Sequence, residues 1–247
     1  MRPKKSTIAL VAFSIFSIST ANSAPLTITN HSFEDDVVVV DGDFDASSTL
    51  GPTGGPTGWG VYSSIAGATA SRQFGTLNPS AAQFDSVPDG SNVGLVFLRT
   101  AGIGEAGLQQ TLSDTLLLNT SYTLTVEVGN FRDGDAGDSF DFNGFPGYRI
   151  DLLAAGNPTP LASDSNTLTI AEGAFETSIV TLTTGSSHMD EGEALVIRLV
   201  NLNGAGIEVN FDDVRLDASP VPEPSTTALL LGAVGLICAG LMRNRTS

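Results

Sequence analysis

Short runs of alternating apolar and polar residues dominate the sequence between residues 24 and 219. In the clearest run, 120–128, Tyr122, Leu124, Val126 and Val128 are separated by Thr123, Thr125 and Glu127. An alternation of period two gives one apolar and one polar face, which is the pattern of a half-buried β-strand. No stretch of 12 residues in this region has a helical pattern. The region is therefore predicted to be built from strands.

Further runs of the same kind are short, rich in β-branched or aromatic residues and bounded by Gly, Pro, Asp and Asn. They are 26–29, 37–40, 59–63, 92–98, 108–112, 148–154, 168–170, 175–182, 194–201 and 208–216. So many strands without helices predict an all-β fold, a two-sheet β-sandwich of the jelly-roll type. One helical turn is expected within 113–119, and long loops are expected at 49–59 and 133–147.

The predicted sandwich, 24–219, has the size of one domain and is strongly acidic. Residues 24–222 hold six arginines, no lysine and 26 acidic residues, a formal charge of −20. Such a surface repels nucleic acid and anionic lipid, so DNA and RNA are excluded as partners. The single cysteine, Cys238, lies outside this region. The predicted domain therefore has neither a disulfide nor a thiol nucleophile.

The first 23 residues have the order of a secretory signal peptide. Arg2, Lys4 and Lys5 precede an apolar run at 8–18, and Ala21-Asn-Ser23 supplies a small-x-small cleavage site. A signal anchor is the alternative. We expect cleavage after Ser23 and export of the remaining chain.

The last 28 residues, 220–247, combine an extended motif, an apolar segment and a basic end. Val221-Pro222-Glu223-Pro224 precedes an uncharged segment at 226–242, predicted to be a short transmembrane helix, and a tail at 243–247 with two arginines. A buried core helix is the alternative. The order resembles the PEP-CTERM sorting signal, which implies an exosortase as the processing partner and a transient membrane anchor on the way to the cell envelope or extracellular matrix.

Catalytic motifs are scarce. His31 and His188 are the only histidines, and neither a His-Glu-x-x-His nor a Gly-x-Ser-x-Gly run is present. A pair of carboxylates that hydrolyses glycosides needs no such motif, but no pair stands out among the acidic residues. The chain is therefore predicted not to be an enzyme.

Two separated stretches indicate a calcium site. Asn30-His-Ser32-Phe-Glu34 stands near the start of the predicted domain, and Phe211-Asp212-Asp213-Val214 stands near its end. They resemble the opening and closing strands of galactose-binding-like jelly rolls, as in carbohydrate-binding modules. The resemblance implies a structural calcium ion held by Glu34 and Asp212, and oxygens from Asn30 or Ser32 would suit the same hard cation. Ordinary solvated acids are the alternative.

The closing strand also changes phase. Ile207, Val209 and Phe211 alternate on one parity, whereas Val214 and Leu216 lie on the other. A β-bulge at Asp212–Asp213 would explain the change. The acidic loops 133–141 and 41–45 are weaker cation candidates because neither has the spacing of a complete calcium loop.

A sugar-binding face needs exposed aromatic rings with amide or guanidinium donors beside them. The candidate ligand-binding residues are Trp59, Tyr62, Arg99 and Tyr148. The function we predict is that of an exported, non-catalytic module with a structural calcium that associates with extracellular polysaccharide. An acidic matrix protein cross-linked by divalent cations and a polysaccharide hydrolase or lyase are the alternatives.

Overall fold

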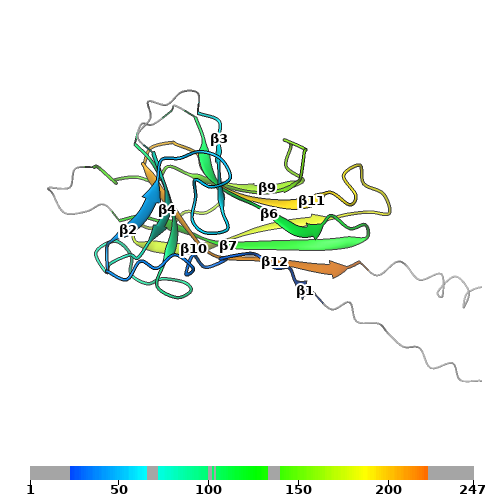
Figure 1. The fold of residues 1–247 in the computed structure, drawn as a ribbon, viewed down its shortest axis with the longest axis horizontal. Coiled ribbons are helices and arrows are strands. Elements are labelled where there is room, and N and C mark those ends of the chain that lie inside the picture. The colour runs from blue at the N-terminus through cyan, green and yellow to red at the C-terminus, as the bar shows by residue number, and fades with distance from the viewer. Residues whose placement is uncertain (1–22, 66–71, 100–101, 103, 133–139, 222–247) are drawn as a thin grey trace, which may run out of the picture.

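Two antiparallel sheets pack face to face in the computed structural model, which describes residues 23–65, 72–99, 102, 104–132 and 140–221 (Figure 1). The larger sheet has the order β10-β7-β12-β5-β4-β2, with β1 paired to β12, and the smaller has the order β3-β6-β11-β8-β9. The predicted all-β, two-sheet sandwich is confirmed. The strands are β1 Ala24–Pro25, β2 Phe44–Ser47, β3 Gly60–Ser63, β4 Arg72–Leu77, β5 Val93–Leu98, β6 Ala106–Thr115, β7 Thr120–Asn130, β8 Tyr148–Ala154, β9 Ala162–Ser165, β10 Ala174–Thr183, β11 Ala194–Asn201 and β12 Glu208–Pro220.

The main core lies between the two sheets. Alternate residues of each strand supply it, as the period-two pattern requires. Val126 and Val128 of β7 and Val209 and Phe211 of β12 face Ile197 of β11 and its neighbours in one buried cluster. The predicted alternation in 122–128 is therefore confirmed as a core-facing strand.

A second apolar cluster covers the outer face of the larger sheet. Its buried members are Leu77, Phe84, Val93, Leu95, Phe97 and Phe131. Leu95 and Phe97 lie on the opposite parity of β5 from Val96 and Leu98, which belong to the main core. Because of this second cluster, β5 is buried on both of its faces. Polar residues that share the outer face are consequently buried too.

The longest strand, β12, pairs with two different strands along one of its edges. Its first residues, 208–211, pair with β5, and 217–218 pair with β1 on the same edge. Between these two stretches, the pairing with β7 shifts register between Asp212 and Arg215, and Asp213 has a φ of 44°. The predicted β-bulge at Asp212–Asp213 is confirmed. It lets Phe211 and Val214 both point into the core despite their odd spacing.

Some local predictions were wrong. Residues 113–115 continue strand β6 and form no helical turn, and 26–29, 37–40 and 168–170 lie outside the strands. β2, β4 and β9 had not been predicted, although 49–59 is the expected loop with one isolated bridge at Gly51.

Both chain ends leave the described part of the protein at the same end of the sandwich, since Ala24 pairs with Ala218 (Figure 1). The predicted transmembrane helix and basic tail lie outside the described residues. Of the predicted signal peptide only Ser23 is described, and of the sorting motif only Val221. Within the described ranges, no helix has the length and apolar character needed to cross a membrane.

Candidate functional site

Glu208 is a buried carboxyl on the outer face of the larger sheet. It begins β12 and lies directly opposite Phe97 of β5 in the strand register. Only 5% of the residue is exposed. Burial raises the pKa of the Glu208 carboxyl to about 8, and a hydrogen bond from the Asn210 side chain opposes this rise only in part. Glu208 therefore keeps its proton at neutral pH.

Asn210 lies two residues further along β12, on the same face. Its side-chain Nδ2 donates a hydrogen bond to the backbone oxygen of Gly94, at 3.3 Å. Two oxygen atoms of this pair, Glu208 Oε1 and Asn210 Oδ1, are buried without a hydrogen-bond partner. Buried polar atoms are nearly always paired in folded proteins, so unpaired ones need a reason.

Phenylalanine rings cover this face. Phe84, Phe97, Phe131, Phe140, Phe142 and Phe175 form one connected set, with ring centroids between 4.5 and 6.3 Å apart. Two rings of the set, Phe175 and Phe84, lie over Gly129 of β7. Gly129 is paired with Asn210 in the strand register. A Cβ atom at Gly129 would lie 2.6 Å from the Phe175 ring, so the rings need a glycine at this position.

An open cleft adjoins Glu208. Its volume is about 410 Å³, and its walls are Arg99, Phe140, Asp141, Asn143, Ala205, Gly206 and Ile207. Gly206 and Ile207 directly precede Glu208 in the chain. The Arg99 guanidinium stands 5.0 Å from the centroid of the Phe140 ring at the cleft. Arg99, a predicted ligand-binding residue, thus lines the same cleft as Ile207, the residue before the buried acid.

These groups together suit acid catalysis. A carboxyl that is protonated at neutral pH can act as a general acid, and an apolar site is the usual way to raise its pKa. Aromatic faces attract positive charge that develops on a bound molecule. We therefore regard Glu208, Asn210 and the phenylalanine set as the candidate active site.

Trp59 and Tyr148, two of the predicted ligand-binding residues, lie in the main core. Trp59 is 2% exposed, stacks on Phe33 at 5.6 Å and donates its indole N–H to the backbone oxygen of Asn30. The Tyr148 hydroxyl donates to Asp164 Oδ2 at 2.6 Å. Neither ring offers a face to a bound molecule, because packing on both sides occupies it.

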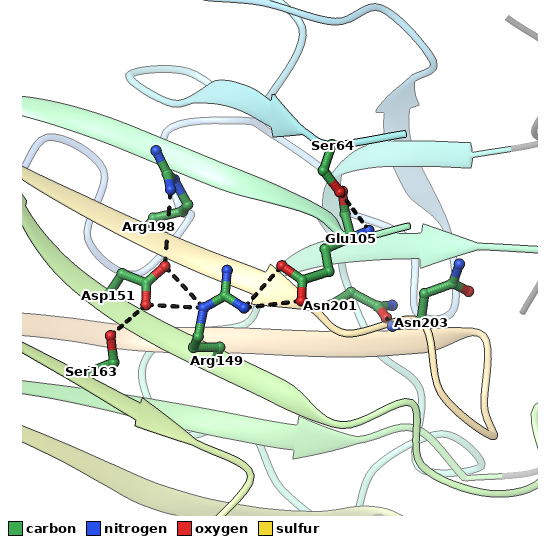
Figure 2. A network of polar contacts seen from close by, with 8 residues as sticks. All are labelled: Ser64, Glu105, Arg149, Asp151, Ser163, Arg198, Asn201 and Asn203. Carbon is green, nitrogen blue, oxygen red and sulfur yellow. Dashed lines mark hydrogen bonds and ion pairs between the residues drawn. The ribbon is translucent and has the colours of Figure 1, made fainter. Parts of the chain in front are cut away.

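Tyr62, the remaining predicted ligand-binding residue, belongs to the outer face of the smaller sheet. The Arg198 guanidinium covers its ring at 3.9 Å. Figure 2 shows the polar network beside it, in which Asp151 lies between two arginines. Arg149 Nε donates to both oxygens of Asp151, at 3.0 and 3.1 Å, and Arg198 Nη1 lies 4.0 Å from Asp151 Oδ2.

The arginines and carboxylates of this network pair with one another. Arg149 also pairs with Glu105 at 2.9 Å, and the Ser163 hydroxyl donates to Asp151 at 2.7 Å (Figure 2). Two arginines thus face two carboxylates, and the buried Asp151 has its charge balanced. This face differs from the Glu208 face, where a carboxyl is buried and no basic partner is recorded for it in the described part of the chain.

The predicted calcium ligands meet at one loop. Glu34 Oε1 accepts hydrogen bonds from the backbone N–H groups of Ser91 and Asn92, at 2.7 and 2.6 Å, and Asp212 Oδ2 accepts one from Asp89 N–H at 2.9 Å. Glu34 and Asp212 therefore hold the two ends of the 89–92 loop. The two carboxylates are brought to one corner, although no direct contact between them is recorded among the described residues.

Asn30 has a local structural role in the same corner. Its Oδ1 accepts from the backbone N–H of Asp35 at 3.0 Å, and its own φ is 50°. Ser32 follows it in the same turn. Within the described ranges, His31, Asp89 and Asp213 form a trio of metal-ligand type, with one atom of each within 4.8 Å of the others. None of these three residues had been predicted as a ligand.

Asp212 itself is fully buried, and burial raises the pKa of its carboxyl to about 8. A buried carboxylate with acidic neighbours and no basic partner is expected when a cation completes the site. The donors at this corner therefore fit a hard cation. Of the weaker candidates, most of 133–141 lies outside the described residues. In 41–45, the only hydrogen bond recorded for the Asp43 side chain among the described residues is the one that it accepts from Phe44 N–H.

A sandwich with a buried, protonated carboxyl in an aromatic layer has the features of an acid catalyst. Comparison with known proteins places the chain in a family of enzymes. The HpiC1-like family, described as HpiC1 cyclase, matches residues 24–217, and the PEP-CTERM protein-sorting motif matches 220–245. The chain therefore belongs to the HpiC1-like cyclase family and carries a PEP-CTERM signal.

Solved structures of cyclases from Fischerella are similar over almost their whole length. The Stig cyclase Fisc from Fischerella sp. TAU, in complex with (3Z)-3-(1-methyl-2-pyrrolidinylidene)-3H-indole, is 34% identical, covers 81% of this chain and 100% of its own, and gives a TM-score of 0.72. A cyclase from the same source in complex with 4-(1H-indol-3-yl)butan-2-one is 35% identical, with coverages of 81% and 99% and a TM-score of 0.68. No curated protein gives a match.

Carbohydrate-binding modules are also among the structural neighbours. A CBM4 structure is 15% identical, covers 78% of this chain and 99% of its own, and has a TM-score of 0.46. At that level nothing about a ligand follows.

Two predictions are overturned by the family match. The chain was predicted to be a non-catalytic module associated with polysaccharide, and not an enzyme. Its membership of a cyclase family contradicts both statements. The prediction was based on the absence of histidine and serine motifs and of an evident carboxylate pair, whereas the candidate acid is a single carboxyl whose pKa depends on burial.

The prediction of a PEP-CTERM sorting signal is confirmed. The motif implies processing by an exosortase, export and association with the cell envelope.

Glu208 and Asn210 had not been predicted as site residues. Both lie at the polar positions of a strand that alternates polar with apolar residues. Polar residues in such a pattern usually face solvent. A signal was available in the number of phenylalanines, 13 in the chain, since they exceed what the core between the sheets takes up. Phe84, Phe97 and Phe131 form the second cluster instead.

Proposed function

We propose that this chain is an exported cyclase in which Glu208 is the general acid. The single observation that carries this proposal is the buried Glu208 carboxyl, which stays protonated at neutral pH beneath a layer of phenylalanine rings. The family match supports the reaction class, ring formation.

The proposed substrate has an electron-rich aromatic body of the indole class and an unsaturated side chain. Two observations support it. The phenylalanine set offers stacking faces to a flat ring, and the similar Fischerella cyclases were crystallised with indole compounds. The cleft of about 410 Å³ beside Glu208 is in the size range of a small-molecule site.

The proposed reaction is an isomerisation. The Glu208 proton adds to one carbon of the side-chain double bond, and that π pair becomes the new C–H bond. The aromatic body supplies the electron pair for the new C–C bond, which closes the ring. The ring system then loses a proton to the Glu208 carboxylate, which restores the acid. Nearby phenylalanine faces stabilise the positive charge between these steps.

Indoles that carry unsaturated side chains test the proposal directly. The full-length protein is incubated with each compound, and products of unchanged mass and new retention time are sought. We expect Glu208→Gln to lower the rate by about 100-fold or more, because general acid catalysis contributes that much. Glu176→Gln, on an exposed position of β10, is the matched control and should keep the parent rate. Full activity of Glu208→Gln would refute the role of Glu208.

We further propose that a structural calcium ion occupies the corner of Asp89, Asp212 and Asp213. The buried Asp212 carboxyl, which has no recorded basic partner, supports this ion. Calcium would supply positive charge and tie the 89–92 loop to β12, and no step of the reaction requires it. Glu34 would act from the other end of the loop.

For the tail, we propose that the segment 226–242 is a transmembrane helix that anchors the chain until an exosortase acts near Val221-Pro222-Glu223-Pro224. The motif match supports the sorting step. Retention of the protein in the membrane fraction after deletion of 220–247 would contradict the anchor.

A further inference from the structure

The Asn210 side chain has a fixed orientation. The amide nitrogen must face the backbone oxygen of Gly94, 3.3 Å away, since only a donor can satisfy that oxygen. The Asn210 side chain also lies near enough to the Glu208 carboxyl to oppose the rise of its pKa in part. The amide nitrogen is therefore held by the Gly94 oxygen, and Oδ1 is the end that remains.

Asn210 Oδ1 is an acceptor without a partner in a fully buried residue. It belongs to the outer face of the larger sheet, because Asn210 is opposite Leu95 and Gly129 in the register. Leu95 belongs to the apolar cluster there, and phenylalanine rings lie over Gly129. Hydrocarbon neighbours cannot donate a hydrogen bond. The O–H of protonated Glu208 is the protein donor on this face, and in the proposed reaction its proton goes to the substrate, so we assign the donor for Asn210 Oδ1 to the bound molecule.

We propose that Asn210 is a specificity-determining residue whose Oδ1 accepts a hydrogen bond from an N–H group on the aromatic body of the substrate. This inference rests on the proposed function and adds to it a requirement on the substrate. Residues i and i+2 of a strand stand roughly 7 Å apart on the same face. A flat molecule held at Asn210 by its N–H would therefore extend its side chain toward the Glu208 carboxyl.

Asn130 is a similar buried asparagine on the other face of the larger sheet. Asn130, on β7, also has a buried Oδ1 without a partner, and its amide donates to the backbone oxygen of Ile170. It lies on the same parity as Val126 and Val128, which face the core between the sheets. Asn130 is therefore equally buried but directed away from the candidate site, which makes it a matched control.

The test compares two probes that differ by one hydrogen-bond donor, 4-(1H-indol-3-yl)butan-2-one and its N-methyl analogue. Their dissociation constants are measured by calorimetry with the full-length protein. We expect the N–H probe to bind at least about tenfold more tightly, because the methylated probe leaves Oδ1 unpaired. We expect Asn210→Ala to reduce this ratio to about twofold or less, while Asn130→Ala keeps it.

The outcomes separate the two proposals. If the parent protein binds both probes equally, or if Asn210→Ala keeps the tenfold ratio, the role of Asn210 is refuted and the cyclase proposal stands. If the parent protein binds neither probe, the indole-class substrate is refuted and the role of Asn210 falls with it. The ratio in the parent protein alone decides the matter if Asn210→Ala does not fold.

Discussion

Glu208 on β12 and Phe97 on β5 lie directly opposite each other, so a carboxyl and an aromatic ring share one cross-strand pair on the outer face of the larger sheet. The sheet register produces this pair, and the second apolar cluster buries it. A side chain that would be solvated on an open sheet thereby becomes an acid that is neutral at pH 7.

Glu208 should make the free energy of unfolding depend on pH. The pKa of its carboxyl is about 8 in the folded protein and near the ordinary 4.5 in the unfolded chain. Between these values the unfolded chain loses the proton and the folded protein keeps it, so stability falls as pH rises and then levels off above about 8. Urea unfolding at pH 5, 7 and 9 measures this slope.

Glu208→Gln should remove that contribution. The variant should be a few kcal/mol more stable than the parent at pH 9 and close to it at pH 5, since a neutral amide pays no cost of ionisation. Glu176→Gln, which changes an exposed carboxyl, should leave the slope as it is. An unchanged slope in Glu208→Gln would show that Glu208 is not the buried acid described here.

The predictions made from the sequence succeeded where a strand has one apolar parity or is apolar throughout. Residues 148–154 and 194–201 were predicted with the bounds that β8 and β11 have. Strand β4, Arg72–Leu77, was missed because its own residues are mixed, and it is held by pairing with β2 and β5. The valines at 37–40 were predicted as a strand, yet Val37 and Val39 are exposed in a loop.

The candidate site was harder to predict than the fold. Val209 and Phe211 identify the face of β12 that packs on the core. The pattern then predicts that the alternate residues, Glu208 and Asn210, face solvent. The residues on the opposite face of β12 are buried by segments that carry Phe84 and Phe142. These segments come from distant parts of the chain. The pKa of Glu208 is a consequence of this tertiary covering, which no local pattern reports.

The charge network on the smaller sheet should matter for stability. Arg149→Ala would leave Asp151, which is fully buried, with only the more distant Arg198. We expect a loss of about 3 kcal/mol in the free energy of unfolding, because removing one partner of a buried ion pair leaves an uncompensated charge. Chemical denaturation of the full-length protein measures it.

Arg215→Ala is the control for that experiment. Arg215 pairs with Asp213 at the surface, where the arginine side chain is 61% exposed, and such pairs contribute little. A loss of the same size in both variants would mean that burial of Asp151 is not the cause.

Calcium should raise the midpoint of thermal unfolding. An ion present at about 100 times its dissociation constant adds ~2.7 kcal/mol, which corresponds to several degrees. Asp212→Asn and Asp213→Asn should lower or abolish the shift between calcium and chelator. No shift in the parent protein would contradict the proposed ion.

Glu34→Ala separates two roles at the same corner. Glu34 accepts three hydrogen bonds from Ser91 and Asn92, so its removal should lower stability in chelator as well as in calcium. A variant that is destabilised only in calcium would mean that Glu34 acts through the ion rather than by holding the loop.

The protonation state of Glu208 is the central claim and can be measured without a substrate. Infrared difference spectra of the parent protein and Glu208→Gln, recorded from pH 4 to pH 10, isolate the carboxyl band of this residue. The account predicts a protonated carboxyl that persists at pH 7 and titrates with a midpoint near 8. A midpoint near the ordinary value of 4.5 would contradict it, since an ionised Glu208 has no proton to give.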